Sequence, residues 1–75
     1  MSSTVSPGHY VKVHYRMNKV TEGIVSAIER ALEGVRAIVV ECSDGKTAVI
    51  TNKDISLIFV RNLEGGAVTW TLAQL

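Results

Sequence analysis

The sequence predicts an all-β domain, and three stretches carry that prediction. Residues 10–17 alternate apolar and polar side chains, which is the pattern of a half-buried strand. Residues 35–42 are mostly β-branched and apolar, which favours a second strand. Residues 46–60 hold two short apolar runs on either side of a polar corner, and we interpret these runs as two more strands. One alternative stays open, an α+β fold with a helix over 20–33.

The chain length limits how much stability one copy can generate. The chain has 75 residues, which predicts a single domain that buries only about 60% of its unfolded surface. Domains this small usually depend on disulfides, a metal or association. Cys42 is the only cysteine and the histidines are few, so we expect neither an internal disulfide nor a metal site, and no cofactor. We therefore expect a homo-oligomer.

Charge and hydropathy restrict the class of partner. The net charge of +1 argues against binding nucleic acid by bulk charge, although it permits a local basic patch. No apolar run is long enough to cross a membrane, and the N-terminus lacks the basic and then apolar pattern of a secretion signal. A lone free thiol suits a reducing compartment, so we expect a cytoplasmic protein with no membrane contact.

Both ends of the chain differ from its centre. Residues 1–9 are small and polar and contain Pro7-Gly8, so we expect a flexible N-terminal arm. Residues 63–75 form a C-terminal extension, in which 67–72 is one more candidate strand carrying Trp70.

The segment over 20–32 fits two structures. Val20, Ile24 and Ile28 recur at helical spacing, and good helix formers follow them. Gly23 is costly inside a helix and more natural at a strand bend. Local propensity favours the helix, but it is a weak guide that tertiary contacts override.

The strands that flank the polar corner are apolar on both faces. A continuous apolar run implies cover on both sides of the sheet, and so short a chain has little to supply it. We therefore expect a second copy to supply the cover. The predicted oligomer interface consists of Ala48, Val49, Ile50, Leu57, Ile58, Phe59 and Val60.

From residue 10 to 60 the order of segments resembles the Sm/LSm/Hfq family of small, strongly bent β-barrels. Val11, Val13 and Tyr15 resemble the alternating first strand of the family, and Gly23 resembles the glycine at the bend of the next strand. Residues 50–56 lie where the family has Ile-Arg-Gly-x-x-Ile, or Tyr-Lys-His-x-Ile-Ser in its bacterial branch.

The resemblance implies a fold. It predicts an Sm-like (SH3-like) five-stranded bent barrel over 10–62, with an extra C-terminal strand. It also changes the prediction for 20–28 from helix to strand and makes 29–34 a loop or a single helical turn.

The resemblance also implies a function, a non-catalytic ring that binds single-stranded RNA. Strand pairing between neighbours would close a ring of about five to seven subunits. The polar corner would then face the central opening in every subunit. The RNA-binding candidates are Arg30, Thr51, Asn52, Lys53 and Asp54.

Two alternatives to RNA binding at the corner stay open. Lys12, His14 and Arg16 share one strand face and form a secondary basic face, which would follow phosphates or simply be solvated. The oligomer could instead serve as a structural or protein-interaction module that binds no nucleic acid.

Catalysis is not expected, because the sequence shows no nucleophile-and-base order, paired carboxylates or phosphate-binding glycine loop.

Overall fold

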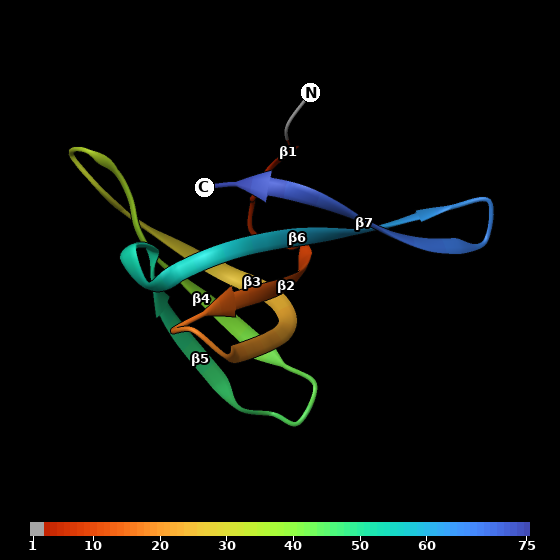
Figure 1. The fold of residues 1–75 in the computed structure, drawn as a ribbon, viewed down its shortest axis with the longest axis horizontal. Helices are drawn as coiled ribbons and strands as arrows, with labels where there is room; N and C mark the ends of the chain where they lie inside the picture. Colours follow the sequence, from red (N-terminus) through yellow and green to blue (C-terminus); the bar gives the residue numbers. More distant parts are fainter. Residues whose placement is uncertain (1–2) are drawn as a thin grey trace.

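The computed structural model describes residues 3–75 and is all-β (Figure 1). The elements are β1 (Ser3–Thr4), β2 (Tyr10–Tyr15), β3 (Lys19–Ala31), β4 (Gly34–Cys42), β5 (Thr47–Thr51), the short 3-10 helix η1 (Asn52–Asp54), β6 (Ile55–Glu64) and β7 (Ala67–Gln74). The strands form one sheet in the order β1-β7-β6-β2-β3-β4-β5. Within the described residues, none of the helical segments is long and apolar enough to cross a membrane.

The sheet is an open, curved antiparallel sheet of the kind found in small β-barrels. Strands β2 to β7 pair antiparallel, and only the short contact between β1 and β7 is parallel. The sheet is not closed, because β5 stands at its end with no second neighbour in the described residues. The predicted all-β class and the extra C-terminal strand are thus confirmed.

The strand predicted for 20–28 is confirmed, the alternative helix over 20–33 is wrong, and the loop or helical turn expected over 29–34 is reduced to a two-residue turn. Strand β3 runs without a break from Lys19 to Ala31, and a turn at residues 32–33 leads into β4. Pairing explains the difference. The first part of β3 pairs with β2 and the rest pairs with β4, so hydrogen bonds to both neighbours outweigh the helical spacing of the isoleucines.

Gly23 is the point at which β3 passes closest to β4. It is buried and lies opposite Cys42. A side-chain carbon there would overlap the backbone carbonyl oxygen of Glu41 and lie 2.9 Å from Cγ1 of Val40. Only glycine fits without moving the backbone. A register shift follows between Val25 and Ala27, and together the two features allow β3 to curve.

The core lies on the inner face of the curved sheet and is aliphatic. Val11, Val13, Ile38 and Val40 are fully buried, and the described residues contain no buried polar side chain. The complete buried cluster is Val5, Val11, Val13, Val25, Ile38, Val40, Ile50, Ile58, Val60 and Ala73. Every strand from β2 to β7 contributes to it, so the inner face supplies one continuous core.

The N-terminal segment, expected from its composition to be a flexible arm, is held against the sheet in its described part. Val5 is 2% exposed and donates its backbone N–H to the carbonyl of Gln74 at 3.0 Å. Gly8 donates to the carbonyl of Val25 at 2.8 Å, and Val25 donates to that of His9 at 2.9 Å. The burial of Val5 explains why this segment is held, because a valine side chain gains free energy when it leaves water for the core.

The C-terminal extension forms a hairpin with the second half of β6. Residues 59–64 of β6 pair with residues 67–72 of β7, and Gly65 and Gly66 make the turn with φ of 57° and 82°. Figure 1 shows this hairpin and the β3–β4 hairpin extending beyond the rest of the sheet. The first half of β6 is left unpaired on the side where β7 lies.

Gly23→Ala is expected to lower the free energy of unfolding by about 1–3 kcal/mol, because the added carbon forces β3 away from β4. Urea denaturation followed by circular dichroism measures the change. The control is Ala27→Ser, an exposed position on the same strand. Equal stability of Gly23→Ala and the wild type would contradict the close approach.

Candidate nucleic-acid interface

The polar corner between β5 and β6 is short and tied to the neighbouring strand. Thr51 is still extended, with φ −73° and ψ 137°, and the chain then turns through η1. The side-chain nitrogen Nδ2 of Asn52 donates to the backbone carbonyl of Val35 at 2.9 Å. This hydrogen bond joins the corner to β4 across 17 residues of sequence. The corner is therefore a positioned element of the sheet, not a free turn.

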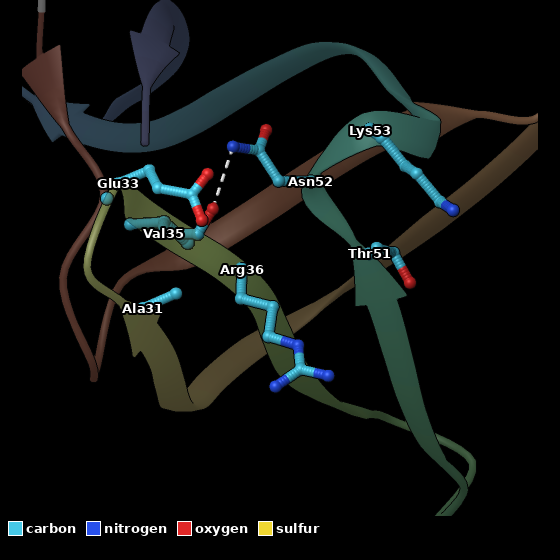
Figure 2. Close-up of a pocket in the computed structure, with 8 residues that line it drawn as sticks. Ala31, Glu33, Val35, Arg36, Thr51, Asn52 and Lys53 are labelled. Carbon is cyan, nitrogen blue, oxygen red and sulfur yellow. Dashed lines mark hydrogen bonds between the residues drawn. The ribbon is translucent and has the colours of Figure 1, made fainter.

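An open hollow of about 750 Å³ lies between this corner and the end of the β3–β4 hairpin. Its lining comes from two separate parts of the chain, residues 31–36 and residues 51–53. The lining residues are Ala31, Glu33, Gly34, Val35, Arg36, Thr51, Asn52 and Lys53. Figure 2 shows Asn52 reaching toward Val35, while Lys53 extends in the other direction.

Hydrogen-bonding groups and charges of both signs surround the hollow. Arg36 and Lys53 carry positive charge, and Glu33 carries negative charge. The guanidinium of Arg36 lies 3.5 Å from a carboxylate oxygen of Glu29, but both side chains are more than half exposed. Such an ion pair is weak and easily exchanged for another anion. The hollow can therefore accept a phosphate beside groups that hydrogen-bond a base.

The structure brings together three of the residues that the sequence predicted for RNA binding. Thr51, Asn52 and Lys53 all line the hollow. Asp54 does not, because its carboxylate is 3.3 Å from Nε of Arg16 and its backbone carbonyl accepts from the N–H of Arg16. Arg30 is exposed on β3 and is not part of the lining.

Arg36 is the lining residue that sequence reasoning missed. It belongs to β4, which the sequence identified only as a strand. Pairing of β4 with β5 places Ala37 opposite Thr51, and this register puts Arg36 beside the corner. The alternation of Val35, Arg36 and Ala37 was the available signal, because an isolated charge in an apolar strand marks a solvent-facing position.

The predicted secondary basic face is divided in the structure. Lys12 and His14 lie on the outer face of β2, because they alternate with the buried positions Val11 and Val13. Arg16 lies beyond the strand and pairs with Asp54 at the corner. Lys12 in turn lies 3.7 Å from a carboxylate oxygen of Glu22 on β3. Only Lys12 and His14 share a surface.

The predicted oligomer interface also divides into two sets. Ile50, Ile58 and Val60 are buried in the core of their own chain. Ala48 and Phe59 are partly buried. Val49 is 64% exposed and Leu57 is 46% exposed, on the opposite face from the core. The chain therefore covers one face of these strands itself, and only the outer face is left for a partner.

Among the strand edges that are open in the described residues, two flank the polar corner. One is β5, which pairs with β4 alone. The other is the first half of β6, residues 55–58, which pairs with β2 but not with β7. An apolar groove of about 300 Å³ runs beside this second edge, between β6 and the end of β7. Its lining includes Ile55, Leu57, Leu72 and Leu75.

Comparisons with known proteins found no match for this chain among protein-family models, curated proteins or solved structures.

Asn52→Ala is expected to lower the free energy of unfolding by about 1 kcal/mol, because it removes the hydrogen bond to the carbonyl of Val35. Urea denaturation is the measurement. Lys53→Ala is the control, since that side chain is exposed on the same turn. If both variants keep wild-type stability, Asn52 does not hold the corner against β4.

Proposed function

We propose that the chain is a non-catalytic, ring-forming small β-barrel protein that binds single-stranded RNA at the polar corner. The observation that carries this proposal is the hollow, because Thr51, Asn52 and Lys53 line it together with Arg36 from another strand. Single-stranded RNA readers combine hydrogen-bonding groups for base edges with cations for phosphates. The resemblance to the Sm/LSm/Hfq family supports the same proposal, since its RNA-binding motif occupies the corresponding corner.

Each lining residue has a role in this proposal. Asn52 uses one N–H for Val35, so its side-chain oxygen is available to accept from a base N–H. The hydroxyl of Thr51 can donate or accept. Lys53 and Arg36 are the phosphate contacts, and Arg36 also presents a plane on which a base can stack.

The open edges support ring formation. Strand β5 has five residues and a free edge, and residues 55–58 of β6 have a free edge beside an apolar groove. An unpaired edge is a template for pairing with another chain, and joining two different edges head to tail generates a ring when the rotation closes. Val49 and Leu57 would then lie at the contact. A ring repeats the hollow at fixed spacing, so weak contacts add to strong binding.

A second candidate function is an oligomeric scaffold that binds proteins and no RNA. The near-neutral net charge of +1 favours it, as do exposed apolar side chains such as Leu32, Leu63 and Val68. The two candidates differ in what happens when RNA is added to the assembled protein.

The double variant Asn52→Ala/Lys53→Ala is expected to bind RNA roughly tenfold more weakly or worse, since each subunit loses contacts of about 1.5 kcal/mol. Fluorescence anisotropy with U-rich, A-rich and mixed oligonucleotides measures the affinity. Lys46→Ala is the matched control, because it removes an exposed lysine outside the hollow. If the wild-type assembly binds none of the oligonucleotides at low salt, the scaffold function is favoured instead.

Light scattering is expected to give a mass several times the 8.1 kDa of one chain. Val49→Lys should reduce that mass toward the monomer, because a lysine on an edge strand opposes edge pairing. Leu32→Lys is the control, since it introduces the same charge at the exposed tip of the β3–β4 hairpin. A wild-type monomer at high concentration would contradict the ring.

A further inference from the structure

Most aromatic side chains of this protein lie on the outer face of the sheet, on the side opposite the buried core. Among the described residues, the buried cluster contains no aromatic ring, and only Tyr15 packs against it. Tyr10, Phe59 and Trp70 lie on the outer face instead. Tyr10 precedes the buried Val11, and Phe59 stands between the buried Ile58 and Val60.

Strand pairing assembles these rings from distant parts of the chain. Lys12 on β2 is opposite Phe59 on β6, and Arg61 on β6 is opposite Trp70 on β7. The rings of Tyr10 and Trp70 are 6.2 Å apart, although 60 residues separate them in the sequence. We call the surface formed by Tyr10, Lys12, His14, Phe59, Arg61 and Trp70 the outer aromatic face.

Cations lie directly on the rings of this face. The guanidinium carbon of Arg61 is 3.8 Å from the ring centre of Tyr10, and the ammonium of Lys12 is 4.5 Å from that of Trp70. The ring of His14 meets the ring of Phe59 edge to face at 5.8 Å. These contacts hold both the rings and the positive charges in position before any ligand arrives.

The charge of the outer aromatic face favours an anionic ligand. Glu22 is the acidic group in contact with it, and that carboxylate is already engaged by Lys12 at 3.7 Å and by the hydroxyl of Tyr10 at 3.2 Å. Arg61 forms no ion pair with any carboxylate in the described part of the chain. Burial raises the pKa of Tyr10, as does its hydrogen bond to Glu22, so the hydroxyl stays neutral.

We propose that the outer aromatic face binds single-stranded nucleic acid, by stacking bases on Trp70 and Arg61 and by holding phosphates with Lys12 and Arg61. Large rings are normally used to fill a core, so their place beside fixed cations on a solvent face indicates a stacking surface. Apolar side chains border the rings, and Leu72 and Ile24 are 54% and 50% exposed. This proposal rests on the proposed function only in its class of ligand, which is single-stranded nucleic acid.

The outer aromatic face and the hollow are separate surfaces. The hollow adjoins the corner just before Ile55, the first residue of β6. Arg61 lies roughly 20 Å further along that strand, at about 3.3 Å per residue. A single strand of RNA can therefore contact the two surfaces with different nucleotides, and each contact can be removed without removing the other.

Trp70 is the only tryptophan, so its fluorescence reports on the outer aromatic face alone. We expect U-rich and A-rich RNAs of about 16 nucleotides, the upper end of the usual site sizes, to quench it saturably. In anisotropy, Trp70→Ala should bind roughly five- to 150-fold more weakly, which is the range for losing one stacked base. Arg61→Gln is the second variant, and Lys46→Gln is its control, because Lys46 is an exposed cation outside both the hollow and the outer aromatic face.

The outcomes separate this proposal from the proposed function. If RNA binds and Asn52→Ala/Lys53→Ala weakens it, but Trp70 emission and the Arg61→Gln affinity do not change, the outer aromatic face is overturned and the hollow stands. RNA could instead quench Trp70 in Asn52→Ala/Lys53→Ala with the same affinity as in the wild type. That result supports the outer aromatic face and contradicts RNA binding at the hollow. If Trp70 emission instead changes with protein concentration in the absence of RNA and RNA has no effect, the face binds a second copy and the proposal is overturned.

Discussion

One curved sheet that buries only its inner face is the constraint on which the rest of this structure depends. The aliphatic cluster around Ile38 and Val40 is complete within a single chain, and every long strand contributes to it. The curvature that brings the strands of this cluster together comes from β3. This strand passes against the backbone of Glu41 at Gly23 and shifts register after Val25. A side chain at Gly23 would overlap the Glu41 carbonyl and force the two strands apart at this point.

The same constraint explains why the functional candidates lie where they do. Because the inner face is filled, ligands and partners have only the outer face, the strand edges and the ends of the hairpins. The polar corner is held at one end by Asn52, the first half of β6 is left open beside an apolar groove, and the rings gather on the outer face. The open half of β6 follows from the strand pairing, since β7 covers only the second half of β6.

Local pattern predicted some of these features and not others. The alternation at residues 10–17 and the β-branched run at residues 35–42 each reflect short-range chemistry, and the strand that each predicts is present as β2 and β4. The isoleucine spacing in β3 misled, because strand pairing on both sides outweighed helical propensity. Among the site residues, Thr51 to Lys53 are adjacent in sequence and could be predicted. Arg36 and the contact of Tyr10 with Trp70 depend on register between distant strands, which no local pattern contains.

A matched pair of substitutions tests whether stability comes from one face of the sheet and leaves the other face free. Ile38 on β4 is fully buried, whereas Ile24 on β3 is 50% exposed on the outer face. Guanidinium denaturation should show that Ile38→Ala loses about 2–5 kcal/mol, as buried isoleucines do, and that Ile24→Ala loses less than about 1 kcal/mol. Equal losses at the two positions would contradict the account, because they would show that the outer face is packed as tightly as the core.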